Sequence, residues 1–165
     1  MKQISKIFAF SILLIGFTMS TFGQGVSATA NASATIITPL TITSTTALSF
    51  GNISVGAIAG GTVVVSPANV RTATGTCSFQ AVPASSAAGF DITGANGANL
   101  LVTLPANATI LNGATPMTLD TFVHDAPATI VGGALTFHVG ATLHVSNAQL
   151  AGPYNGTFNV TINYN

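Results

Sequence analysis

The chain has 165 residues, only 4% of them charged, and a formal net charge of zero at pH 7. This length suits one domain with a two-layer core. We expect no nucleic-acid partner, because phosphate binding requires clustered lysine and arginine side chains. The single cysteine, Cys77, excludes an internal disulfide. Since Cys77 shares an alternating phase with Phe79 and Ala81, we interpret it as a small buried hydrophobic residue.

Residues 1–23 are typical of a cleaved export signal. Lys2 and Lys6 precede an apolar run at residues 7–17, which is too short to span a bilayer, and small or polar residues follow. Cleavage after Gly23 would leave one arginine and three aspartates, a formal charge of −2, and no transmembrane segment. An uncleaved membrane anchor is the alternative. We therefore expect a secreted or cell-surface protein that passes through the periplasm.

Residues 24–35 form an N-terminal extended segment with strict period-two alternation. One phase consists of a valine and four alanines: Val26, Ala28, Ala30, Ala32 and Ala34. Alternation favours a strand, although alanine is a poor strand former. The segment is either an ordinary first strand or a detachable extension that pairs with another subunit. The β-sandwich domain is then expected to comprise residues 36–165.

Short strand patterns fill this domain. Residues 36–43 predict an edge strand that changes direction at Pro39. Residues 62–66 contain three adjacent valines, which predict a strand buried on both faces and ended by Pro67. Further strands are predicted at residues 75–82, 89–93, 100–104, 117–124 and 134–146, with Gly- and Asn-rich turns between them. The pattern indicates an all-β fold, an antiparallel β-sandwich of immunoglobulin-like or pilin-like type.

The last strand pattern alternates a large apolar face with an Asn and Thr face. The apolar phase contains Tyr154, Gly156, Phe158, Val160, Ile162 and Tyr164. Such a strand is typical of an antiparallel sheet that covers a core on one side. If this face points inward, Ile162→Ala should cost roughly 2 to 5 kcal/mol, whereas Thr161→Ala should be nearly neutral.

Several motifs together resemble a secreted bacterial family known only as domain of unknown function 4402. They are Pro39-Leu-Thr-Ile-Thr43, Leu48-Ser-Phe-Gly51, Gly61-Thr-Val-Val-Val-Ser-Pro67, Arg71-Thr-Ala-Thr-Gly75, Phe90-Asp-Ile-Thr-Gly94, Val139-Gly-Ala-Thr-Leu143 and Gly152-Pro-Tyr-Asn-Gly156. The family pattern usually has a second glycine where Ala141 stands. Membership implies export and a β-rich fold, but no established activity.

The C-terminal strand also resembles that of chaperone-usher pilins and their spore-coat-U-like relatives. Gly152 is fourteenth from the end, alternating hydrophobic residues follow it, and Tyr164 is penultimate. This resemblance implies self-association or pairing with sister subunits, and a periplasmic chaperone. Pilins commonly have a cysteine pair, and their donor segments usually carry larger side chains than the alanines here.

We predict no catalytic, cofactor-binding or metal-binding residues. His138 and His144 share the polar phase of one strand and would lie roughly 20 Å apart, unless Gly140 bends it. Adjacent His124 and Asp125 should point apart, and the chain has no glutamate and no serine in a nucleophile elbow. The remaining cation, Arg71, is expected to hydrogen-bond turn carbonyls rather than an anion.

The favoured function is a non-enzymatic structural subunit of a surface or pilus-like assembly, associating by strand pairing. In this hypothesis residues 24–35 complete a neighbour's sheet, with Val26 and the alternate alanines filling small pockets, and Gly152 to Tyr164 supplying the pairing strand. The alternative is a self-complete, monomeric β-sandwich that binds a ligand or mediates adhesion through its loops.

Overall fold

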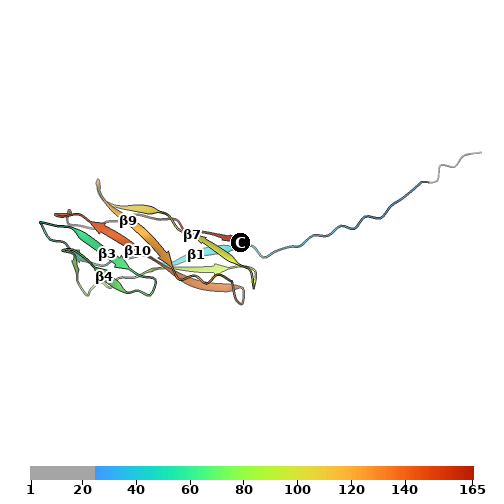
Figure 1. Ribbon diagram of the computed structural model, residues 1–165, viewed down its shortest axis with the longest axis horizontal. Helices are drawn as coiled ribbons and strands as arrows, with labels where there is room; N and C mark the ends of the chain where they lie inside the picture. Colours follow the sequence, from blue (N-terminus) through green and yellow to red (C-terminus); the bar gives the residue numbers. More distant parts are fainter. Residues whose placement is uncertain (1–24) are drawn as a thin grey trace, which may run out of the picture. The chain divides into compact units, whose positions relative to one another are not determined.

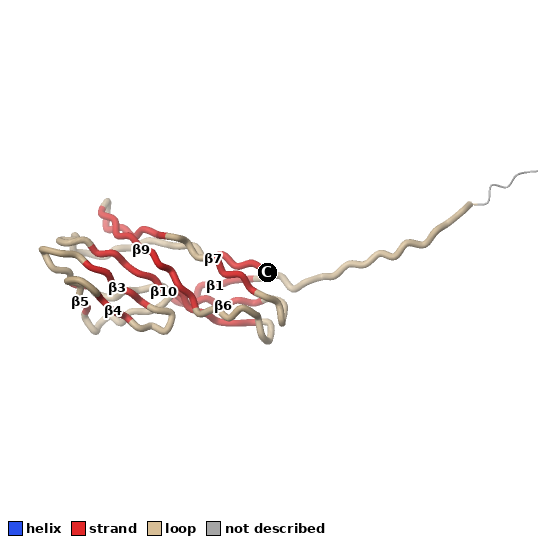
Figure 2. The backbone as a smooth tube through the Cα atoms, in the orientation of Figure 1, coloured by secondary structure: helices blue, strands red, loops and turns tan. Residues whose placement is uncertain are grey.

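The structure is a computed structural model that describes residues 25–165; the expected signal peptide and Gln24 lie outside the described residues. The described residues form eleven strands and no helix (Figure 2). Accordingly, no helix in this range is long and apolar enough to cross a membrane. Every strand pair is antiparallel. The predicted all-β, antiparallel, sandwich-like class is confirmed.

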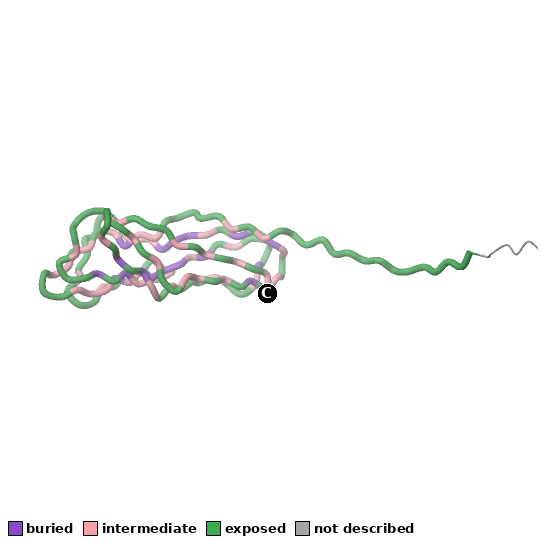
Figure 3. Tube along the Cα trace, turned by 90° about the horizontal axis from the view of Figure 1, so that it is seen from above, coloured by how far each residue is buried: buried purple, intermediate pink, exposed green. Residues whose placement is uncertain are grey.

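The chain divides into two units, Met1–Thr35 and Ile36–Asn165. Within the first unit, residues 25–35 form no strand, and all of them are exposed (Figure 3). The side chain of Val26 is 97% exposed. An apolar residue at this level of exposure gains nothing from the hydrophobic effect.

The second unit contains one large sheet and two small ones (Figure 1). The large sheet has the order β1 (Thr41–Thr46), β6 (Ala88–Thr93), β10 (Ala134–Val145), β3 (Gly61–Val65) and β4 (Arg71–Ala73). In addition, β9 (Thr115–His124) pairs with β10, and β8 (Asn107–Asn112) pairs with β9. One small sheet pairs β11 (Thr161–Tyr164) with β7 (Leu100–Thr103), and the other pairs β2 (Ile53–Ser54) with β5 (Ser78–Phe79).

Strand β10 connects the parts of the large sheet. Along one edge its residues 134–139 pair with β6 and its residues 141–145 pair with β3, while β9 lies on the opposite edge. The register with β9 shifts between Gly140 and Thr142. At Gly140 a Cβ atom would collide with the carbonyl oxygen of Val65. Glycine is therefore required where β10 changes its partner from β6 to β3, because the backbones lie close together there.

Strand β10 also contributes to both halves of the core. Its inward residues Ala141, Leu143 and Val145 pack in one cluster of buried residues, which includes Phe50, Val63, Val65 and Leu119. Phe137 and Val139 pack in a second cluster, which includes Ile92, Leu100 and Ile130. The period-two pattern of β10 thus produces a single inward face that serves two clusters.

Several predicted strands have different limits in the structure. The edge strand starts at Thr41 rather than residue 36, and the pattern at residues 75–82 yields only β5. Strand β3 is buried on one face only, because Val63 and Val65 are fully buried but Val64 is half-buried on the opposite face. Strands β2, β4 and β8 were not predicted. Asn112 and Gly113, a turn of the predicted Gly- and Asn-rich kind, join β8 to β9.

The C-terminal pattern forms two pieces rather than one continuous strand. Asn155 pairs with Leu111 of β8, and the regular ladder begins only at Thr161. The prediction of which face points inward is nevertheless right. The large apolar side chains are half-buried, whereas the alternating Asn and Thr side chains are exposed. Phe158, Val160, Ile162 and Tyr164 pack against the second core cluster.

A matched pair of substitutions in β11 tests this facing. Ile162 is half-buried, so Ile162→Ala is expected to cost about 2 kcal/mol, the low end for this change in a core. Thr161 is exposed, and Thr161→Ala should stay within about 0.5 kcal/mol of wild type. Urea unfolding monitored by circular dichroism measures both. Equal losses at the two positions would contradict the inward assignment of Ile162.

Candidate functional site

The domain contains a groove with a volume of about 940 Å³. Two segments supply most of its walls: residues 44–55, which run from the end of β1 through β2, and residues 149–158, which precede β11. Side chains of β6, β8, β9 and β10 supply the rest. We call this feature the groove, and we call residues 47–52 its N-terminal rim.

The groove is lined largely by apolar side chains. They are Leu48, Phe50, Ile53, Val55, Phe90, Ile110, Met117, Leu119, Leu143, Val145, Tyr154 and Phe158, together with small residues such as Ala88 and Ala108. None of the residues that line it is charged. A site of this kind favours an uncharged, apolar occupant, because a buried charge without a partner is costly.

Backbone groups along both walls lack strand partners within residues 25–165. On the N-terminal rim, Ser49 exchanges two hydrogen bonds with Ser86, at 2.8 and 2.9 Å. The neighbouring Leu48 directs its N–H and C=O to the other edge, where no described backbone group pairs with them. On the opposite wall, Asn155 pairs with Leu111, whereas residues 156–160 make no backbone hydrogen bond to another described segment. The groove therefore has open strand edges as well as an apolar lining.

Arg71, at the start of β4, holds the N-terminal rim. Its Nη1 donates to the carbonyl of Phe50 at 2.7 Å, and its Nη2 donates to the carbonyl of Gln80 at 2.6 Å. The guanidinium carbon lies 4.0 Å from the centroid of the Phe79 ring. The expectation that Arg71 binds turn carbonyls is thus confirmed.

The predicted inward phase around Cys77 is only partly correct. Cys77 is half-buried against the first core cluster, and this burial raises the pKa of its thiol. Phe79, however, is 40% exposed, and Ala81 is exposed as well. The reason is that Phe79 stacks under the Arg71 guanidinium instead of entering the core.

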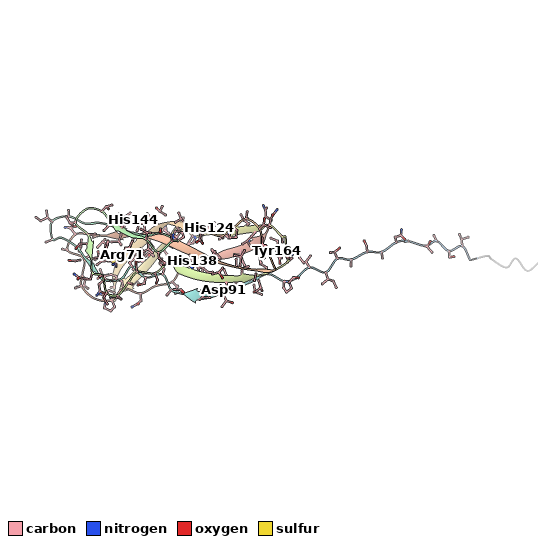
Figure 4. All side chains as sticks on the ribbon, turned by 90° about the horizontal axis from the view of Figure 1, so that it is seen from below. Arg71, Asp91, His124, His138, His144 and Tyr164 are labelled. Carbon is pink, nitrogen blue, oxygen red and sulfur yellow. The ribbon has the colours of Figure 1, made fainter. Side chains whose placement is uncertain are left out.

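Two of the three histidines each pair with an aspartate. The His144 Nε2 atom lies 2.9 Å from an Asp120 carboxylate oxygen, and the His138 Nδ1 atom lies 3.4 Å from Asp125. The hydrogen bond with His144 lowers the pKa of Asp120. Figure 4 shows His138 and His144 well apart. Within residues 25–165 no three histidine, cysteine or acidic groups gather closely enough to hold a metal ion.

His124 lies at the end of β9, as expected. Its Nδ1 accepts a hydrogen bond from the Ala126 N–H at 3.1 Å, and its ring meets the Phe137 ring edge-on. The adjacent Asp125 turns to β10 instead, where it accepts from the His138 N–H at 2.6 Å. Adjacent side chains therefore point to different partners.

The structure distributes the predicted pairing residues over three places. Gly152, Tyr154 and Phe158 line the groove. Val160, Ile162 and Tyr164 pack against the second core cluster, and the Tyr164 hydroxyl donates to the Thr38 carbonyl at 2.8 Å and accepts from the Ala95 N–H at 2.7 Å. Val26, Ala28 and Ala30 lie in the exposed segment. Their role in assembly remains a prediction.

Sequence reasoning missed the N-terminal rim as a wall of the groove. The available signal was the short alternation of Leu48 and Phe50 around Ser49, within a motif that was quoted only for its family resemblance. In the structure Phe50 is buried in the first core cluster while its backbone carbonyl meets Arg71.

The comparisons with known proteins identify the family of the chain and nothing further. No curated protein and no solved structure was found to match the chain. The family model described as a domain of unknown function, DUF4402, matches residues 40–164. This match covers almost all of the folded unit, including the groove and both of its walls. The chain therefore belongs to the family of domain of unknown function 4402.

Proposed function

We propose that this protein is a non-enzymatic structural subunit of a surface or pilus-like assembly, and that its subunits associate by β-strand pairing. The observation that carries the proposal is the groove, in which an apolar, uncharged lining lies between two chain segments with unpaired backbone groups. A strand inserted there would satisfy both features at once: its backbone would pair with the edges and its alternate side chains would cover the lining.

The proposed occupant is the segment 24–35 of a second copy, which we call the donor segment. Its described residues are exposed and uncharged, so they are free to pair and they match the uncharged lining. Successive side chains of a strand point to opposite faces. Val26 and the alternate alanines would therefore face the groove, while the Ser, Thr and Asn phase would face solvent.

The donor segment and the groove are different surfaces of the same chain. Such a contact is heterologous, so each subunit that donates its segment still offers an empty groove to the next, and growth continues in one direction. The proposal includes export to the cell surface and, before assembly, a periplasmic chaperone that covers the groove. Exposed apolar strand edges otherwise promote aggregation.

The experiment that tests this function is the solution mass of the exported protein, measured by light scattering after size-exclusion chromatography. A ladder of long-lived oligomers is expected. A sharp, stable monomer whose N-terminal segment resists proteases would refute the assembly role. That result would favour the alternative, a monomeric extracellular ligand-binding or adhesion module.

A further inference from the structure

We propose that Arg71 is the positioning residue of the groove: its guanidinium fixes the N-terminal rim in the shape that accepts a donor strand. This inference rests on the proposed function and adds to it the residue that prepares the acceptor. It concerns a side chain that lies outside the donor segment, so we expect its effect on accepting a strand and not on donating one.

The guanidinium joins three parts of the chain. Arg71 extends from β4, whose residues pair with β3. One amino group holds the carbonyl of Phe50 on the rim, and the other holds the carbonyl of Gln80 in the segment after β5. Other hydrogen bonds tie the rim to the segment 78–86: Ser49 pairs with Ser86, the Ser86 hydroxyl donates to the Ala47 carbonyl, and Asn52 bonds Gln80 and Val82. The bond from Arg71 differs from these because it ties the rim to β4.

The rim turns directly beneath the guanidinium. Gly51 has a φ of 68°, a left-handed conformation that favours glycine. A Cβ atom at Gly51 would collide with the Arg71 Nη1 atom and would lie 2.7 Å from the carbonyl oxygen of Pro83. The absence of a side chain lets the guanidinium reach the Phe50 carbonyl, and the bond in turn holds the Phe50 ring, which lines the groove, in the core.

Arginine is suited to this task for a chemical reason. A guanidinium presents several donors in a fixed planar fork, so it can bind two carbonyls at once and still stack on an aromatic ring. Lysine offers a point charge on a flexible stem and cannot reproduce that geometry. Arg71 is the only lysine or arginine in residues 25–165, and here it bonds two carbonyls rather than a carboxylate.

Without the Arg71 guanidinium the rim should be less ordered and should bind a donor strand more weakly. Part of the binding free energy would then be needed to order the rim. We expect Arg71→Gln to raise the concentration at which half of the chains assemble by about tenfold or more. Arg71→Lys retains a charge and a single donor group, and should give a smaller rise. This graded response would reflect the number of carbonyls that the side chain can hold.

The test uses full chains in a mixing experiment. One chain carries Ala30→Asp, which places a carboxylate on the apolar phase of the donor segment but leaves the groove intact. The other carries Arg71→Gln or Arg71→Lys and an intact donor segment. Each should assemble poorly alone, whereas the mixture should form one-to-one complexes, because the Arg71 variant can still donate to the intact groove. Light scattering of the separate and mixed samples measures both effects.

Thr74→Val is the matched control. It removes the two hydrogen bonds that the Thr74 hydroxyl makes to Thr62, next to β4, but it does not touch the rim, and assembly should remain as in wild type. Two results would overturn the proposed role of Arg71 but not the proposed function. One is that Arg71→Gln assembles as well as wild type, and the other is that Thr74→Val weakens assembly as much as Arg71→Gln does. A wild-type chain that stays monomeric would refute the proposed function itself, which makes the two failures distinguishable.

Discussion

Deletion of residues 24–35 is expected to abolish assembly and leave a folded, monomeric domain. The described part of this segment is exposed throughout and forms no strand, so its deletion removes no buried residue. Both core clusters consist of residues beyond position 39 and remain complete. The unfolding free energy should therefore change by no more than about 0.5 kcal/mol, while the oligomer ladder disappears from light scattering.

A synthetic peptide with the sequence of residues 24–35 provides the complementary measurement. The truncated domain keeps an empty groove, so it should bind one peptide per chain, and bound peptide should raise its stability. At a peptide concentration of 100 times the dissociation constant the gain is about 2.7 kcal/mol. A peptide with the same composition in scrambled order is the control. Unchanged assembly of the truncated chain would rule out this segment as the donor.

The fold was largely predictable because the period-two pattern of a strand shows which of its side chains point inward. In β10 the inward residues Phe137, Val139 and Ala141 recur at every second position, and all three are buried. Strand β8 was not predicted because only two apolar residues, Ala108 and Ile110, show the alternation clearly. They bury little surface and lie between Asn residues. The double burial predicted for β3 was wrong at Val64, since a run of valines does not reveal whether a second layer covers the outer face.

The groove was harder to foresee than the strands. Its walls come from residues 44–55 and residues 149–158, which are distant in sequence, and its defining property is that particular backbone edges stay unpaired. Alternation predicts which face of a strand points inward, but strand order decides which edge has a neighbour. Arg71 illustrates the same limit. Its bonding to turn carbonyls followed from the scarcity of acidic partners, whereas the choice of Phe50 and Gln80 depends on tertiary structure.

Two adjacent substitutions in the donor segment should differ sharply in their effect on assembly. Ala30 lies on the apolar phase and Asn31 on the opposite one. Ala30→Asp would carry a carboxylate into an uncharged lining, where no side chain can pair with it. We expect the half-assembly concentration to rise on the order of 100-fold, which corresponds to about 2.7 kcal/mol. Asn31→Asp leaves its carboxylate in solvent and should change that concentration less than about threefold.

Both variants add one negative charge at neighbouring positions, so repulsion between subunits is the same in each and only the facing differs. The concentration dependence of light scattering at two salt concentrations measures the effect and shows whether long-range charge contributes. Equal inhibition by the two variants would mean that the segment does not insert as a strand with one face buried. Full assembly of Ala30→Asp would mean that another part of the chain fills the groove. Strand insertion requires a large difference in assembly between the two variants, with Ala30→Asp the weaker donor. Adjacent side chains of a strand point to opposite faces, so only one of the two carboxylates would enter the groove.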